Sequence, residues 1–225
     1  MDYKDRVNKY YYEHKKVDTN NSERPLFYYQ EENREHDPIY NDPNAKHQVY
    51  AIGCCWTYGW GVEQTQTYTH LLGDKDTAVY NYGVGATGLD FATRTLSKVY
   101  DKTMDNQIFI VTIPHLWIRT WFNKDGEVYK SWKLNQYVEI DDSNNYFNFL
   151  HHYELINNFV GRDKVIWGCF GGKSGDILKL NEQIGDKVDL TFDLIDVSDN
   201  KLHPGPKSHK KYAEKLKNVL QDRFK

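Results

Sequence analysis

Short apolar runs alternate with longer amphipathic segments along most of the chain, from His47 to the C-terminus. The runs are rich in β-branched and aromatic residues and are bounded by Gly, Asp or Asn, as is typical of strands. The run QIFIVTI at 107–113 is apolar almost throughout, which indicates a strand covered on both faces of a parallel sheet. The pattern predicts four main strands and a short fifth, at 48–53, 77–83, 107–113, 164–170 and 189–196.

The segments between these strands have helical spacing. Apolar residues recur every three or four positions in 89–99, and the last segment, from Pro206 onward, has apolar residues on one side and lysines on the other. We expect helices at 62–72, 89–99, 144–159 and from Pro206 to the end. Strands that alternate with helices predict an α/β fold, with a parallel sheet and helices on both of its faces. Residues 117–133 are predicted to form a β-hairpin insertion around the turn NKDG.

The first part of the chain differs in composition from the rest. Residues 1–46 are polar and tyrosine-rich, and DP dipeptides interrupt them at 37–38 and 42–43. We expect these residues to be an extension with little regular structure of its own. A chain of 225 residues suits one large domain, which we place at 47–225.

Composition excludes several classes of function. The chain has 29 basic and 32 acidic residues and a net charge of −3, which gives no reason to expect a nucleic-acid or membrane partner. No apolar run approaches the roughly 20 residues of a membrane helix, and the N-terminus lacks the apolar stretch of a secretory signal. Three cysteines, two of them adjacent, make a poor disulfide framework, so we expect a reducing, cytoplasmic location. No His or Cys spacing predicts a metal site, and we expect no cofactor; the sequence predicts no oligomeric state.

Three motifs follow three of the predicted strands. GCCWTYG occupies 53–59, NYGVGATG occupies 81–88, and the dipeptide PH occupies 114–115. In a parallel sheet the carboxyl ends of the strands share one edge, where ligands bind, so these motifs predict a site. GVGATG at 83–88 also fits the dinucleotide pattern G-x-G-x-x-G, but it follows the second strand and lacks the expected acidic residue downstream.

Together with DNKLHPGPKSHKKYA at 199–213, the first two motifs resemble the SGNH (GDSL-type) hydrolases, especially a bacterial and phage branch whose first block reads GCSxTYG. The resemblance covers roughly residues 47–220. It implies a flavodoxin-like three-layer α/β/α sandwich with about five strands. It also implies hydrolysis or transfer of an acyl ester by a serine nucleophile, with a histidine base and an acidic partner near the C-terminus. The family's oxyanion hole uses the nucleophile's N–H, a glycine of the second block and an asparagine of the third.

Carried over residue by residue, the nucleophile falls on Cys55 and the base on His203. A thiol beside an imidazole loses its proton more readily than a serine hydroxyl, so a Cys–His pair can perform acyl chemistry. The family's acid position is occupied by Asn200, and Asp199 comes one residue earlier; either could orient the imidazole. The oxyanion donors would be the N–H groups of Cys55 and of Gly85 or Ala86, with His115 replacing the absent asparagine.

Aromatic and basic residues near the same edge complete the predicted site. Arg119 could hold an anionic group of the substrate. The chain has 18 tyrosines and 6 tryptophans, and four aromatic residues are predicted to line the pocket: Trp56, Tyr58, Trp60 and Trp117. This aromatic content and the habits of the family favour an O-acylated carbohydrate as the substrate.

Other interpretations remain open. Cys55 could be a small buried hydrophobic residue, which is how we interpret Cys54. The missing asparagine and the shifted acid favour a catalytically silent relative that binds a glycan or a protein through the same edge. A serine hydrolase whose serine has been replaced by cysteine would show the same motif. His209, near the start of the last helix, is expected to be solvated.

Overall fold

The computed structural model describes residues 44–85, 87–113, 120–122, 128–130, 142–171, 182, 184–199 and 203–224. Its central element is a parallel sheet with the strand order β2-β1-β3-β6-β7. The bounds of the strands are β1 His47–Gly53, β2 Thr77–Gly83, β3 Gln107–Ile113, β6 Val165–Gly171 and β7 Leu190–Asp193. All five predicted strands are therefore confirmed. β1 lies between β2 and β3, so the direction in which successive strands are added to the sheet changes at β1, as in flavodoxin-like folds.

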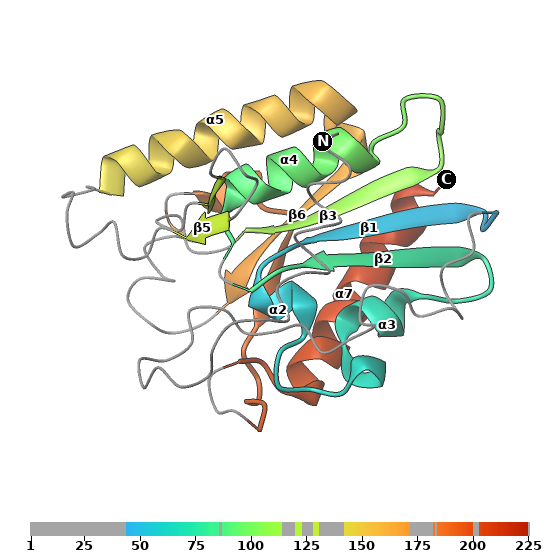
Figure 1. Ribbon diagram of the computed structural model, residues 1–225. Coiled ribbons are helices and arrows are strands. Elements are labelled where there is room, and N and C mark those ends of the chain that lie inside the picture. The colour runs from blue at the N-terminus through green and yellow to red at the C-terminus, as the bar shows by residue number, and fades with distance from the viewer. Residues whose placement is uncertain are drawn as a thin grey trace.

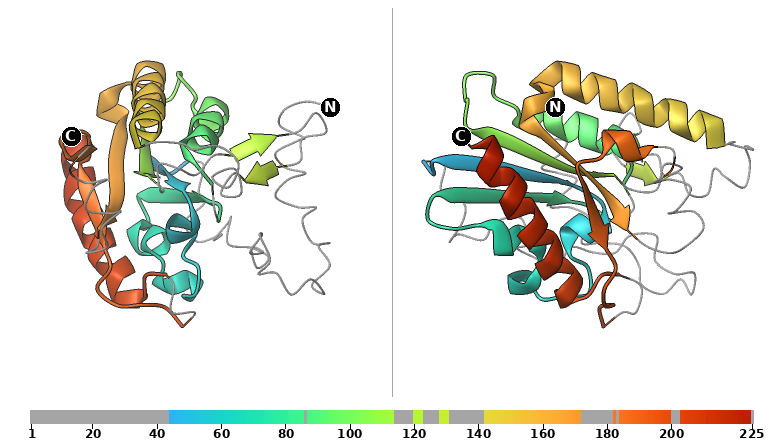
Figure 2. Two further views of the ribbon diagram at one scale, coloured as in Figure 1. Left: turned by 90° about the vertical axis from the view of Figure 1, so that its left-hand side faces the viewer. Right: turned by 180° about the vertical axis from the view of Figure 1, so that it is seen from behind.

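Helices cover both faces of this sheet, so the predicted three-layer α/β/α sandwich is confirmed (Figures 1 and 2). One face carries α3 (Tyr68–Leu72) and α7 (Pro206–Arg223), and the other carries α4 (Leu89–Val99) and α5 (Asp142–Val160). The short helix α2 (Cys55–Tyr58) follows β1 directly at the carboxyl edge of the sheet.

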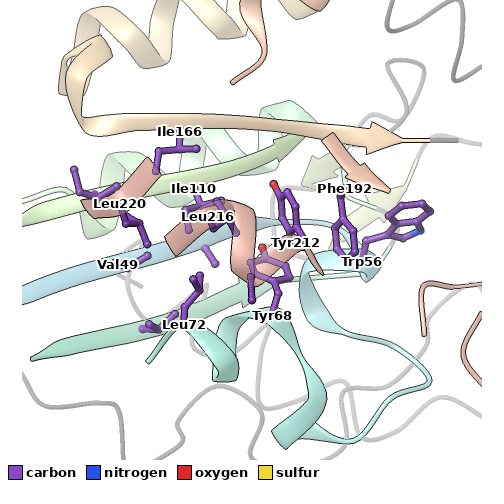
Figure 3. Packing of buried hydrophobic residues seen from close by; sticks show 14 of the residues in the cluster. Val49, Trp56, Tyr68, Leu72, Ile110, Ile166, Phe192, Tyr212, Leu216 and Leu220 are labelled. Atoms are coloured by element: carbon purple, nitrogen blue, oxygen red, sulfur yellow. The ribbon is translucent and has the colours of Figure 1, made fainter. Parts of the chain in front are cut away.

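Successive side chains along a strand point alternately into the two cores on either face of the sheet. Along β3, Ile108 and Ile110 face α3 and α7, whereas Phe109 and Val111 face α4 and α5. Every residue of β3 and of β6 is buried, which explains why the sequence of β3 has no polar alternation. Burial of each such large apolar side chain contributes about 1.5–3 kcal/mol. Figure 3 shows the core on the α7 side, where Tyr212, Leu216 and Leu220 meet the sheet.

One predicted helix is wrong. The segment 62–72 contains a 3₁₀ turn, η1 (Gln64–Gln66), and then α3, with Thr67 between them in an extended conformation. The Thr67 hydroxyl accepts a hydrogen bond from the His70 N–H at 3.3 Å and so caps α3. A threonine favours this cap position over a helix interior, and this local preference overrides the helical spacing of the apolar residues.

The predicted hairpin is present as two antiparallel strands, β4 (Thr120–Phe122) and β5 (Val128–Lys130), and its turn lies outside the described residues. The extension at 1–46 also lies outside them, apart from residues 44–46. Across the described ranges, no helix has both the length and the apolar character needed to cross a bilayer.

Candidate active site

Cys55 lies where β1 ends and α2 begins. Cys54 precedes the helix in an extended conformation, and its carbonyl accepts the Tyr58 N–H at 3.0 Å, which starts the turn. Gly59 ends the turn with a φ of 81°, a left-handed conformation that only glycine adopts without strain. Gly83 at the end of β2 lets this helix approach closely, because a Cβ there would overlap the Tyr58 backbone. The helix is thus fixed between its own cap and the neighbouring strand, and Cys55 is partly exposed at its first position.

The second motif meets Cys55 at this edge. The Val84 N–H donates to the Gly53 carbonyl at 2.9 Å, which joins the end of β2 to the residue before the cysteines. A Cβ on Gly85 would lie 3.9 Å from Cys55 Cβ, so these two residues are neighbours. Ala86, the other candidate oxyanion donor, lies outside the described residues.

His203 lies in a tight loop between β7 and α7. The Ser198 N–H donates to the His203 carbonyl at 2.8 Å, and Val197 forms a bridge with Pro204. The His203 side chain is only 7 % exposed. Asp199 is exposed in the turn inside this loop, and Asn200 lies outside the described residues.

Trp60 links the two candidate catalytic residues. Its backbone N–H donates to the Cys55 carbonyl at 3.1 Å, and its indole contacts the His203 ring, with centroids 4.5 Å apart and planes inclined by 45°. The indole is half-buried. The structure therefore brings Cys55, Gly85, Trp60 and His203 to one region at the carboxyl edge of the sheet.

Two aromatic residues that we expected in the pocket are in the protein interior instead. Trp56 is 9 % exposed and stacks on Phe170, with ring centroids 3.9 Å apart. Figure 3 shows its indole beside Phe192 in the core. Tyr58 is 7 % exposed. The expectation that Trp56 and Tyr58 offer stacking surfaces to a substrate is therefore wrong, because α2 packs against the end of β2 with Trp56 and Tyr58 buried and Cys55 only partly so. Trp117, Arg119 and His115 lie outside the described residues.

The expectation for His209 is also wrong. Its ring is fully buried, and its Nδ1 accepts the Tyr68 N–H at 3.2 Å. This bond joins the first turns of α3 and α7, so His209 serves packing between two helices. Polar residues next to it in sequence concealed this position, since α7 has few apolar residues in its first turn.

Asp196 is a structural residue of the site that the sequence did not reveal. Its carboxylate accepts hydrogen bonds from the N–H groups of Lys207 and Ser208, at 3.0 and 2.8 Å, and from the Ser208 hydroxyl at 2.7 Å. It thereby caps α7, whose own cap residue, Gly205, has no side chain to do so. Partial burial opposes ionisation of Asp196, but the hydrogen bonds from Ser208 and Lys207 outweigh it and lower the pKa of the carboxyl below its ordinary value. A glycine before Pro206 was the available signal that the cap must come from elsewhere.

The other two cysteines, Cys54 and Cys169, are buried. Cys54 is 2 % exposed, as expected, and burial together with the hydrogen bond from Cys55 raises the pKa of its thiol well above the ordinary value. Burial raises the pKa of Cys169 to about 11. A cavity of about 430 Å³ lies beside Cys169, Thr191 and Lys215, and none of the predicted site residues that the structure describes lines it.

Comparison with known proteins supports the fold. No protein-family model and no curated protein sequence matches this chain. Among solved structures, a protein assigned to the lipolytic G-D-S-L family from Desulfitobacterium hafniense is similar over 76 % of this chain and 98 % of its own, at 16 % identity and a TM-score of 0.50. A member of the same family from Veillonella parvula covers 78 % and 98 %, at 12 % identity and a TM-score of 0.52. A family two carbohydrate esterase from Clostridium thermocellum, in complex with cellohexaose, covers 80 % and 65 %, at 10 % identity and a TM-score of 0.51. The chain therefore has the fold of the SGNH (GDSL-type) hydrolases.

Proposed function

We propose that this protein hydrolyses or transfers acyl esters, with Cys55 as the nucleophile and His203 as the general base. The observation that carries the proposal is the position of Trp60, which is hydrogen-bonded to Cys55 through its backbone and packed on His203 through its ring. The motifs around both residues resemble those of SGNH hydrolases, and the fold is the same. Acyl-ester cleavage is the chemistry that a thiol and an imidazole at this edge would perform.

The reaction has two steps. His203 takes the proton of the Cys55 thiol, and the thiolate attacks the ester carbonyl to give a tetrahedral intermediate. Its oxyanion would be stabilised by the N–H groups of Cys55 and of Gly85 or Ala86, with His115 as a further donor. The intermediate collapses to a thioester on Cys55, and His203 returns the proton to the departing alcohol. Water, or an acceptor alcohol in a transferase, then attacks the thioester and regenerates the thiol.

His203 needs a partner that holds its ring in the right orientation. Asp199 lies in the same hydrogen-bonded loop, and Asn200 follows it in the chain. We therefore expect one of these two residues to orient the imidazole. The variants Asp199→Ala and Asn200→Ala separate them, since only the loss of the true partner lowers kcat without changing KM.

The substrate belongs to small-molecule or carbohydrate esters. Trp60 offers a half-buried indole beside His203, and aromatic faces pack well on sugar rings. One structural neighbour is a carbohydrate esterase in complex with cellohexaose. O-acylated carbohydrates are thus the first class to assay, with Arg119 as the residue to test if the substrate is anionic.

Hydrolysis of p-nitrophenyl acetate and of acetylated xylan by the purified protein tests the proposal. Cys55→Ala and His203→Ala should each lower kcat/KM by at least about a hundredfold, the scale of a lost base or nucleophile, and Cys169→Ala is the matched control. Cys55→Ser should retain a fraction of the activity if the site accepts the family's usual nucleophile. Activity that survives Cys55→Ala unchanged contradicts the proposal. A wild-type protein and a Cys55→Ser variant that are both inactive but bind glycans on an array would establish the binding module instead.

A further inference from the structure

The two adjacent cysteines place two thiols together at the candidate nucleophile. All three cysteines of the chain are described, and all three are thiols. Cys55 Sγ and Cys54 Sγ are 3.8 Å apart, in direct contact. Cys54 is 2 % exposed, whereas Cys55 is partly exposed. An oxidant from solvent therefore reaches Cys55 first and finds a second thiol directly behind it.

We infer that Cys54 and Cys55 are a reversible oxidation site, in which a hydroperoxide oxidises Cys55 and Cys54 then closes a disulfide between the two adjacent residues. In the first step the Cys55 sulfur attacks the hydroperoxide and becomes a sulfenic acid, while the hydroperoxide is reduced to an alcohol, or to water if it is hydrogen peroxide. In the second step the Cys54 sulfur attacks Cys55 Sγ, the S–S bond forms, and the sulfenic oxygen leaves as water. Two electrons pass from the thiol pair to the peroxide.

Proximity offsets the weak acidity of the buried thiol. Burial raises the pKa of Cys54, so little of it is thiolate at neutral pH. A reacting group held in contact with its target, however, gains an effective concentration far above that of any dissolved thiol. Cys54 is thus better placed to trap a sulfenic acid on Cys55 than glutathione, which must enter from solvent.

The bond between these residues should be easily reduced. Adjacent Cα atoms are about 3.8 Å apart across a trans peptide, less than the roughly 4.4 Å minimum of ordinary disulfides, so the ring is strained. Strained disulfides have more oxidising potentials and are the labile ones. Closing the ring would also disturb the first turn of α2, because the Cys54 and Cys55 carbonyls accept the N–H groups of Tyr58 and Gly59. The disulfide therefore protects Cys55 from irreversible oxidation. While it is closed, the Cys55 sulfur cannot act as a nucleophile.

Gly85, a neighbour of Cys55, has no side chain, and a Cβ built there would lie 3.9 Å from Cys55 Cβ. Cys169 lies in β6 and faces the α4–α5 core, apart from Cys54, which belongs to the core on the α7 side. It therefore serves as an internal control for a buried thiol in the other core.

Intact-mass and peptide mass spectrometry after exposure to hydrogen peroxide test the inference. The wild-type chain should lose two hydrogen atoms, with Cys54 and Cys55 no longer alkylated by iodoacetamide, and dithiothreitol should restore both. Cys54→Ala should instead gain two oxygen atoms at Cys55, a sulfinic acid that dithiothreitol does not remove. Cys169→Ala should behave as the wild type.

The predicted mass changes do not depend on esterase activity, so they test this inference even if the proposed function is wrong. Only the expected loss of ester hydrolysis on oxidation, and its return on reduction, rests on that proposed function. Oxygen gained at Cys55 in the wild type with Cys54 still alkylatable would overturn the inference. So would a disulfide to Cys169 or to a second chain, or a protein unchanged under conditions that oxidise Cys54→Ala.

Discussion

Asp196→Ala should destabilise the protein measurably, because one carboxylate holds both the start of α7 and the loop that carries His203. The Asp196 carboxylate accepts three hydrogen bonds, two from backbone N–H groups of α7 and one from the Ser208 hydroxyl. Loss of a helix cap costs about 0.5–2 kcal/mol, and bonds to a charged group lie at the upper end of that range. Since the carboxylate is only partly buried, solvent replaces some of what is lost, and we expect about 1–2 kcal/mol. For a chain of this length that lowers Tm by about 2–4 °C per kcal/mol.

The effect has a defined pH dependence. The pKa of Asp196 is lower in the folded chain than its ordinary value of 3.8, so its contribution to stability is present above that value and is lost as pH falls through the folded pKa. The difference in the free energy of unfolding between wild type and Asp196→Ala should therefore be constant from about pH 5 to 8 and shrink below about pH 4.

Urea denaturation at several pH values measures this difference, with Asp199→Ala as the matched control. Asp199 is an aspartate of the same loop but is exposed, so its replacement should change the free energy of unfolding by less than about 0.5 kcal/mol. Equal destabilisation by the two variants would refute the account of the α7 cap. So would a difference for Asp196→Ala that persists undiminished at low pH.

Four further substitutions test how the chain packs around α7 and beside Cys55. Ser208→Ala should cost about 1–3 kcal/mol in urea denaturation, because the buried hydroxyl accepts the Ile195 N–H at 2.9 Å and its loss leaves that donor unpaired. Gly168→Ala should cost about 1–3 kcal/mol, because its Cβ would overlap the Tyr212 hydroxyl, whereas Gly85→Ala, whose Cβ meets its nearest atom at 3.9 Å, should leave stability unchanged. Adding Tyr212→Phe to Gly168→Ala should recover most of the lost stability, and a double variant as unstable as Gly168→Ala alone would show that the overlap is not the cause.

Much of the fold could be predicted from the sequence because its signals are local and repeated. The strands β1, β2, β3 and β6 are short apolar runs with clear ends, and α4 and α7 have regular helical spacing. The prediction of one helix over 62–72 was wrong, because apolar spacing alone does not reveal that Thr67 is extended and caps a helix. Spacing predicts which residues face a core, whereas a cap depends on one side-chain bond.

The placement of the candidate site was easier to predict than its details. The rule that parallel strands end at one edge correctly predicted that Gly85 lies close to Cys55. It could not show that Trp56 points inward onto Phe170, because the direction of a side chain after a strand depends on how many residues the next turn contains. The cap that Asp196 provides for α7 could not be predicted either. Asp196 contacts Lys207 and Ser208, which lie eleven and twelve positions later in the chain, and no local pattern encodes such a contact.

The most direct test of the central claim is to trap the acyl group on Cys55. The protein is mixed with p-nitrophenyl acetate, quenched in acid within its first turnover, and digested for peptide mass spectrometry. We predict an acetyl group on the Cys55 thiol of the wild type, no such group in Cys55→Ala, and acetylation at least about a hundredfold slower in His203→Ala, because the base is lost. Acetylation that falls on other residues, or that proceeds at Cys55 equally fast without His203, would contradict the assignment of these two residues as nucleophile and base.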